Sequence, residues 1–135
     1  MSHFTVLRTQ IVDVDALLTA LADVGFEEVE VHDTAQHLYG YKGDVRQQKA
    51  EVIIRRKFIG RLSNDMGFKR QSNGTYDAII SKFDRRKYSQ KWLNQLTQRY
   101  AYHTTLSQLE EQGFQLTSEE MQKEGQIHLV LRKMA

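Results

Sequence analysis

The chain contains no cysteine, no proline and no long apolar run. Without cysteine there is no disulfide, thiolate metal site, iron–sulfur cluster or thiol nucleophile. A membrane helix needs about twenty mostly apolar residues, so we expect no membrane span. The opening Met-Ser-His-Phe has neither the basic start nor the apolar stretch of a secretory signal. These absences predict an intracellular, cytoplasmic protein whose fold has no covalent cross-links.

The chain does contain enough apolar material for a core. Its 135 residues are 40% hydrophobic and 27% charged, which is the balance of a globular domain rather than of a disordered chain. This length favours one domain over two. Because no proline-rich or low-complexity linker interrupts the sequence, we expect residues 1–135 to form a single domain with short turns built on glycine and asparagine.

Charge is distributed unevenly along the sequence, although the formal net charge is only +2. Residues 1–42 carry two basic and seven acidic side chains, residues 43–100 carry fourteen and five, and residues 101–135 carry three and five. A cationic middle segment attracts acidic proteins, nucleic acid or anionic surfaces; a solvated face balanced by the acidic flanks is the alternative. The candidate partner-binding residues are Arg55, Arg56, Lys57, Arg61, Lys69, Arg70, Arg85, Arg86 and Lys87.

Apolar periodicity in the first third changes from strand to helix and back to strand. Residues 3–9 alternate as a strand, and residues 16–24 repeat with helical spacing after a possible cap at Asp13 or Asp15. Gly25 is suited to end this helix. The pattern therefore predicts a strand followed by a helix.

Residues 26–32 alternate again and predict a second strand, with Val29 and Val31 inward and Glu30 toward water. Residues 33–49 contain two glycines and no clean period, so we expect a loop there with one short strand at most.

Turn and cap signals organise the rest of the chain. Asn73-Gly74 supplies the positive φ angles of a tight turn and predicts a β-hairpin between residues 66–71 and 76–81. Residues 50–54 read as another strand. Ser89 is suited to cap a long helix that runs to Gln112. Two further strands, around residues 114–117 and 126–133, then complete the chain.

These elements favour an α+β fold in which two principal helices pack on one face of a mainly antiparallel sheet. The two expected helices end with the same pattern, in which two leucines three residues apart are followed four residues later by Gly-Phe. The pattern begins at Leu18 and again at Leu106. Two strand-helix-strand-strand halves would explain this echo. A common helix-to-strand junction would explain it as well.

No catalytic or cofactor motif stands out. The chain has no phosphate-binding loop and no dinucleotide fingerprint, and we expect no cofactor and no metal. An enzyme with a site assembled only in three dimensions stays an alternative, and its candidate residues are His3, His32, Asp33 and His37, whose side chains suit a divalent metal. Solvated polar residues are the simpler interpretation of that group.

Basic and aromatic residues also occur together in the central segment. Lys69, Arg70 and Tyr76 surround the expected hairpin, and Phe83 and Trp92 follow. A sheet that presents such side chains can stack bases and hold phosphates, so single-stranded RNA binding is an alternative function. The two later aromatic residues would equally well close the core beneath the long helix.

Several short motifs together resemble a family of small proteins of cyanobacteria and red-algal plastid genomes, known as a hypothetical chloroplast reading frame. The matching segments are Met1–Phe4, Thr9–Ile11 with Asp13 and Ala16-Leu17, Gly43–Arg46, Ala50–Arg55, Asp65–Phe68, Trp92-Leu93, Tyr100–Tyr102, Gln112–Phe114 and Ile127–Arg132. The resemblance implies a photosynthetic lineage and a cytoplasmic or plastid-stromal location. It carries over no activity, cofactor or catalytic residue.

The leading hypothesis from the sequence is a non-enzymatic binding or assembly factor whose cationic central patch meets an acidic protein partner or complex. It depends on the charge segregation and on the lack of a catalytic constellation. The sequence leaves the oligomeric state open.

Overall fold

The computed structural model describes residues 3–121 and 127–133. Its elements are β1 (Phe4–Leu7), α1 (Val14–Asp23), β2 (Glu30–Tyr39), β3 (Val45–Ile54), η1 (Arg56–Phe58), β4 (Met66–Arg70), β5 (Tyr76–Ser81), η2 (Asp84–Arg86), α2 (Gln90–Glu111), β6 (Phe114–Met121) and β7 (Ile127–Lys133). Strands β1 to β5 form one antiparallel sheet in the order β1-β5-β4-β3-β2, and β6 pairs with β7 in a separate sheet. The predicted α+β class is confirmed.

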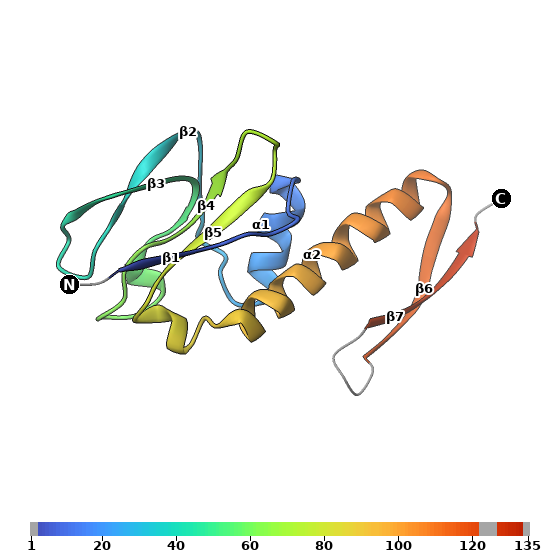
Figure 1. Cartoon of the computed structure of the whole chain (residues 1–135). Coiled ribbons are helices and arrows are strands. Elements are labelled where there is room, and N and C mark those ends of the chain that lie inside the picture. The colour runs from blue at the N-terminus through green and yellow to red at the C-terminus, as the bar shows by residue number, and fades with distance from the viewer. Residues whose placement is uncertain (1–2, 122–126, 134–135) are drawn as a thin grey trace.

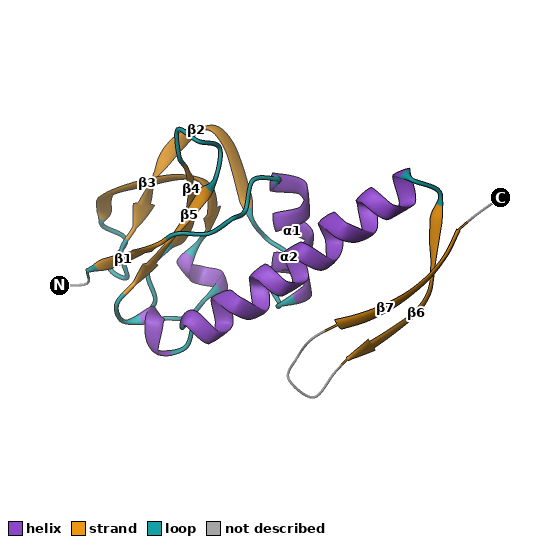
Figure 2. Cartoon of the chain, turned by 45° about the vertical axis from the view of Figure 1, so that its right-hand side comes forward, coloured by secondary structure: helices purple, strands orange, loops and turns teal. Residues whose placement is uncertain are grey.

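Both helices contribute to the apolar cluster on one face of the five-stranded sheet, and Figure 1 and Figure 2 show them on the same side of it. α1 supplies Leu17 and Leu21, and α2 supplies Leu93 and Leu96. Alternate residues of the three central strands pack against them: Val52, Ile54, Met66, Phe68, Ala78 and Ile80. Each large side chain buried in this way stabilises the fold by about 1.5–3 kcal/mol relative to exposure.

α1 begins and ends at the signals read from the sequence. Asp13 Oδ1 accepts a hydrogen bond from an amide of the first turn at 3.2 Å, which satisfies a donor that the helix leaves unpaired. Gly25 follows the last turn with a φ of +104°, a conformation that side chains disfavour. The chain then turns so that Phe26 packs against the rings of Tyr88 and Trp92.

The prediction of a loop at residues 33–49 is wrong, because most of this stretch belongs to two strands. β2 continues to Tyr39, and β3 begins at Val45. β2 is an edge strand, its register against β3 shifts twice, and most of its residues are at least partly exposed. An edge strand of this kind needs no apolar alternation, and bulges break whatever period remains.

The predicted inward orientation is confirmed for Val29, which packs against the main apolar cluster, but is wrong for Val31. Val31 is 48% exposed, and Glu30 instead pairs with Arg55. The strand begins at Glu30, four residues later than the alternation indicated. Because Val29 lies before the strand, a period of two counted from that residue does not carry into β2.

The hairpin predicted at Asn73-Gly74 is confirmed. β4 and β5 pair in register from Gly67 with Ile79 to Arg70 with Tyr76. Gly74 has a φ of +89°, and Asn73 Oδ1 accepts hydrogen bonds from the amide and hydroxyl of Thr75 at 3.0 and 2.7 Å. The asparagine side chain thus takes over part of the hydrogen bonding of the turn.

A smaller apolar cluster occupies the other face of the sheet. It consists of Leu38, Ala50, Ile53 and Ile79, all nearly inaccessible to water. Gly67 lies between Ile53 and Ile79 in the strand register. A Cβ atom at Gly67 would come within 2.7 Å of the Ala50 Cβ and 3.1 Å of a Leu38 methyl group. The close approach of the β2–β3 hairpin to β4 therefore depends on glycine at this position.

α2 is the longest element of the described chain, with 22 residues. The predicted start at Ser89 and the stop before Gly113, where φ is +90°, are confirmed, although the Ser89 side chain makes no capping hydrogen bond. Its buried residues, Leu93 and Leu96, lie near its start, and its far end extends away from the five-stranded sheet toward β6 and β7 (Figure 1). No described helix combines the length and the hydropathy of a membrane span.

The strand-helix-strand-strand order suggested by the sequence echo occurs twice, as β1-α1-β2-β3 and as β5-α2-β6-β7. The strands of the first set all belong to the large sheet, whereas β6 and β7 form a sheet of their own. The two sets therefore share an element order but not a sheet arrangement.

Candidate functional site

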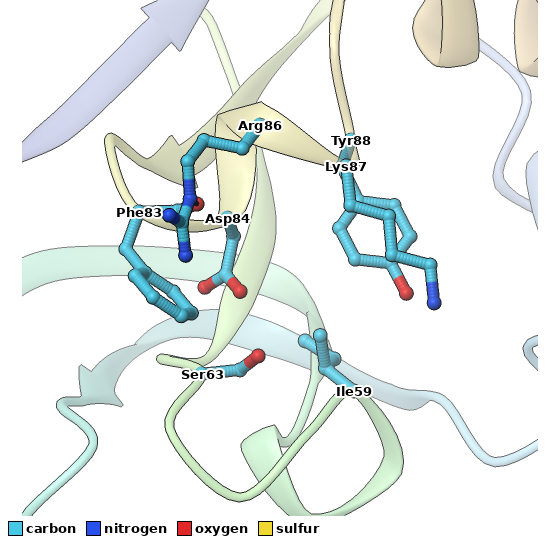
Figure 3. A pocket seen from close by; sticks show the side chains of 7 residues that line it. All are labelled: Ile59, Ser63, Phe83, Asp84, Arg86, Lys87 and Tyr88. Atoms are coloured by element: carbon cyan, nitrogen blue, oxygen red, sulfur yellow. Dashed lines mark hydrogen bonds between the residues drawn. The ribbon is translucent and has the colours of Figure 1, made fainter.

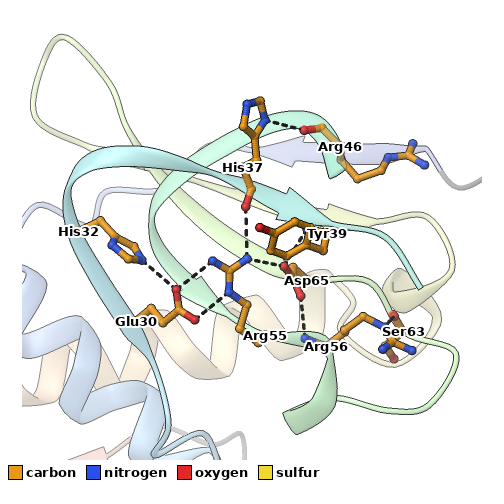
Figure 4. A network of polar contacts seen from close by, with 9 residues as sticks. All are labelled: Glu30, His32, His37, Tyr39, Arg46, Arg55, Arg56, Ser63 and Asp65. Atoms are coloured by element: carbon orange, nitrogen blue, oxygen red, sulfur yellow. Dashed lines mark hydrogen bonds and ion pairs between the residues drawn. The ribbon is translucent and has the colours of Figure 1, made fainter. Parts of the chain in front are cut away.

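Arg55, the first of the predicted binding residues, is held in an internal ion network (Figure 4). Its Nε and Nη2 atoms donate to the two carboxylate oxygens of Glu30 at 2.7 and 2.9 Å, and its Nη1 atom donates to Asp65 Oδ2 at 2.7 Å and to the His37 carbonyl at 3.2 Å. Only 20% of the Arg55 side chain is exposed. These contacts satisfy the guanidinium, so Arg55 is held within the fold by internal partners.

The same network shifts the ionisation of its members. Hydrogen bonding to Arg55 lowers the pKa of Glu30 from 4.5 to about 2, against the opposing effect of burial and with help from His32. The hydrogen bond to Glu30 raises the pKa of Arg55. The pair therefore stays charged over the whole physiological range.

Asp65 fixes the loop between β3 and β4. Its side chain has no exposed surface, and it accepts hydrogen bonds from the amides of Tyr39 and Arg56, both at 2.7 Å. The Arg56 guanidinium in turn donates to the carbonyls of Ser63 and Arg61 at 3.0 and 2.6 Å. These acceptors are carbonyls rather than carboxylates, so Arg56 closes the loop without an ion pair among the described residues.

A second buried carboxylate joins this loop to the turn after β5. Asp84 is 4% exposed, and its Oδ2 atom accepts hydrogen bonds from the Asn64 amide at 3.0 Å and from the Ser81 hydroxyl at 2.7 Å. A buried carboxylate requires such partners. The contact brings together two basic segments, residues 56–61 and residues 85–87, that are far apart in the sequence.

Two adjoining surface hollows lie where these segments meet. One, of about 500 Å³, is lined by Ile59, Ser63, Phe83, Asp84, Arg86, Lys87 and Tyr88 (Figure 3). The other, of about 530 Å³, is lined by residues 56–61 and shares Ile59 with the first. Around them stand five cations, which we call the cationic end: Arg56, Lys57, Arg61, Arg86 and Lys87.

Apolar side chains are exposed among these cations. Phe58 is 42%, Leu62 62% and Phe83 36% exposed. The Lys57 ammonium lies 4.9 Å from the centre of the Phe58 ring, and the Arg86 guanidinium lies 4.3 Å from that of Phe83, distances typical of cation–π contacts. Exposed apolar groups bordered by charge are typical of surfaces that dock another protein.

The remaining predicted cations do not line either hollow. Lys69 and Arg70 are at the far end of β4, where Arg70 lies about 13 Å along the strand from Met66 at ~3.3 Å per residue. Arg85 is half-buried, and its Nη1 atom has no hydrogen-bond partner within the described residues. The structure therefore divides the predicted patch between two ends of the sheet.

The histidines proposed for a metal or catalytic site have other contacts. His32 Nε2 lies 2.8 Å from Glu30 Oε1, and His37 Nδ1 lies 2.7 Å from the Arg46 carbonyl. Within residues 3–121 and 127–133, no three histidine or acidic side chains are placed to hold a metal ion. The structure does not assemble the site suggested from the sequence.

Sequence reasoning missed the apolar part of the cationic end and the role of Glu30. Phe58 and Leu62 lie within a basic loop, where an isolated aromatic or leucine gives no periodic signal. One sequence signal could have revealed these exposed apolar residues. The loop between β3 and β4 is long, and its apolar residues belong to neither strand. The partner of Glu30 is 25 residues away in the sequence, so no local pattern reveals it.

Three similar proteins match the chain over 98% of its length and over 98% of their own. They are described as "Uncharacterized protein ycf35" from Pyropia yezoensis (28% identical over 138 residues), Cyanophora paradoxa (29% over 134) and Guillardia theta (29% over 139). No solved structure matches.

The model of a family described as "Protein of unknown function (DUF1257)" matches residues 20–130, from α1 into β7. Together with the three relatives, this match confirms the resemblance read from the sequence motifs. The chain belongs to the DUF1257 family, a plastid-type family of proteins of unknown function.

Proposed function

We propose that this protein is a non-enzymatic binding or assembly factor that holds an acidic protein segment at its cationic end. One observation carries the proposal: two basic segments distant in sequence surround exposed Phe58, Leu62 and Phe83. The acidic residues of this region, Asp65 and Asp84, are both buried and engaged in hydrogen bonds inside the protein. The positive charge at the surface is thus left for an external anion.

The form of the surface favours an acidic protein over RNA. A protein segment offers carboxylates for the cations and apolar side chains for the hollows beside Ile59. RNA binding would need aromatic faces for stacking, but Phe58 and Phe83 each have a cation over the ring. Tyr76, a residue of the RNA hypothesis, is only 6% exposed, and Trp92 packs against the core.

The proposed compartment is the plastid stroma or the cytoplasm of a photosynthetic cell. The relatives from Pyropia yezoensis, Cyanophora paradoxa and Guillardia theta support this placement.

Charge reversal tests the proposed function. The test variant is Lys57→Glu/Arg61→Glu, because both side chains are exposed and neither carries the ion network of Arg55. The matched control is Lys69→Glu/Arg70→Glu, which changes the charge equally at the other end of β4. Each protein is used for affinity capture from a photosynthetic lysate, at low and high salt, with and without nuclease.

We expect the wild type and the control to capture the same acidic protein, and the test variant to lose it. Capture should weaken with salt, since exposed charges are screened. Equal capture by all three proteins would contradict the proposal. Capture that depends on RNA and disappears with nuclease would instead support single-stranded RNA binding.

A further inference from the structure

α2 carries its charges in the reverse of the order that suits a helix. Lys91 stands in its first turn, which has no acidic residue, and Glu110 and Glu111 stand in its last turn, which has no basic residue. The start of a helix is partially positive and its end partially negative. Both ends therefore oppose the helix's own dipole, and such local conflicts tend to occur where a surface has a purpose beyond stability.

A hollow lies beside the start of α2. It has a volume of about 480 Å³, and Lys91, Trp92 and Gln95 of α2 form part of its wall. The rest of the wall includes the apolar side chains of Phe58 and Ile59, together with Val24, Phe26, Tyr88 and the cation Lys87. The hollow thus combines apolar side chains with polar groups, two of which are positively charged.

The same flank of α2 carries apolar side chains at its other end. At about 100° per residue, the flank that holds Lys91 and Gln95 also holds Tyr102, Leu106 and Leu109, all within a sector of about 60°. Leu106 and Leu109 are three residues apart and so lie together. They belong to neither apolar cluster of the five-stranded sheet, and the exposed Glu110 and Glu111 follow them directly.

We propose that two copies of this chain associate through their α2 helices, packed antiparallel about a two-fold axis. Leu106 and Leu109 of each copy enter the hollow beside Lys91 of the other. Glu110 of one copy then faces Lys91 of the other, and the symmetry makes this contact twice.

Antiparallel packing is the arrangement that the helix itself indicates. A helix of 22 residues is about 33 Å long at ~1.5 Å per residue, so the basic and acidic ends of one α2 cannot neutralise each other. Parallel packing would place like charges together. Antiparallel packing places each basic start beside an acidic end and also aligns the two helix dipoles favourably.

This pairing is independent of the proposed function but borders its surface. The hollow beside α2 shares Phe58, Ile59 and Lys87 with the hollows of the cationic end. Two copies paired in this way would partly cover the surface offered to an acidic partner. Binding of that partner and self-association would therefore compete.

Sedimentation velocity of the full chain over a hundredfold range of concentration tests the pairing. The wild type should show a monomer–dimer equilibrium that salt weakens. Lys91→Glu and Glu110→Lys should each weaken association by about tenfold, since each reverses a charge contact made twice. An equimolar mixture of the two variants should recover association, because in the mixed dimer both contacts are again between opposite charges.

Loss of fold can be separated from loss of pairing. Each reversal brings α2 into agreement with its own dipole, so the Tm of the monomer should rise while association falls. Lys69→Glu, a matched charge reversal on β4, should leave association unchanged. A wild type that stays monomeric throughout would overturn the pairing, and so would a mixture that associates no better than either variant alone. Neither result touches the proposed function, whose test variant leaves Lys91 and both glutamates intact.

Discussion

At the scale of residues, the lack of a side chain at Gly67 lets Leu38 and Ala50 of the β2–β3 hairpin approach β4 closely. In Gly67→Ala the new methyl group would meet Ala50 and Leu38. We expect a destabilisation of about 1–3 kcal/mol, the usual cost of overpacking a core. Urea unfolding measures it, and the double variant Gly67→Ala/Ala50→Gly should regain part of the loss because it moves the methyl group to the facing residue. Unchanged stability of the single variant would show that the hairpin lies farther from β4.

Glu30 makes the stability of the protein depend on pH below neutrality. Its pKa is about 2 in the folded protein against an ordinary 4.5, so the folded state favours the ionised carboxylate. The stabilisation is complete above pH 4.5 and is lost as the pH falls toward 2. Because 40% of the side chain is exposed, solvent screening limits it to about 1 kcal/mol.

The measurement is urea unfolding of the wild type and of Glu30→Gln at a series of pH values. The wild type should be the more stable protein above pH 4.5, and the difference should shrink at lower pH. A difference that stays constant down to pH 2 would show that the Arg55 pair does not set it.

At the scale of elements, Tyr100 joins α2 to the start of α1. Its hydroxyl oxygen accepts hydrogen bonds from the amides of Val12 and Asp13 at 3.0 and 2.9 Å. Tyr100→Phe removes the acceptor of both and should destabilise the protein by about 1–2 kcal/mol, measured by thermal unfolding. Tyr41→Phe is the control, since no hydrogen bond of the Tyr41 hydroxyl occurs within the described part of the chain. Equal Tm values for the two variants would contradict this role.

Elements with local signals could be predicted from the sequence, and elements defined by distant contacts could not. Asp13, Gly25 and the Asn73-Gly74 turn each act through neighbouring residues, so α1 and the β4–β5 hairpin were found. The start of β2 was predicted, but its continuation to Tyr39 was missed because its pairing with β3 is irregular and its residues mostly face water.

The candidate site divides in the same way. Its cations could be read from composition, but not which of them is paired within the protein. Arg55 proved to be internal because Glu30 and Asp65 reach it from other segments, and Lys69 and Arg70 proved remote because β4 carries them to the other end of the sheet. Grouping cations by their closeness in sequence thus made the predicted cationic patch too large. The hydrogen bond between Asn64 and Asp84 shows that the basic segments that meet are residues 56–61 and 85–87.

At the scale of the whole molecule, the buried side chains of α2 lie near one end of the helix. This distribution should determine which amide hydrogens of α2 exchange slowly. Leu93 and Leu96 are buried, and Arg99 and His103 still pair with Asp23 of α1. From residue 104 onward no described residue of α2 is buried. Because exchange follows local opening, we expect slow exchange in β3 to β5 and in residues 93–103, and fast exchange in residues 104–111.

Native-state hydrogen exchange followed by mass spectrometry measures this gradient. Repeating the measurement at low and high protein concentration also tests the pairing of α2 helices. In a dilute sample the far end of α2 should exchange quickly, and in a concentrated sample pairing of two α2 helices should protect residues 104–111 while the rate in β3 to β5 stays unchanged. Lys91→Glu should abolish the dependence on concentration. Uniform protection along α2 in the dilute sample would mean that its far end is held within the same chain, and would remove the reason for a second copy to bind there.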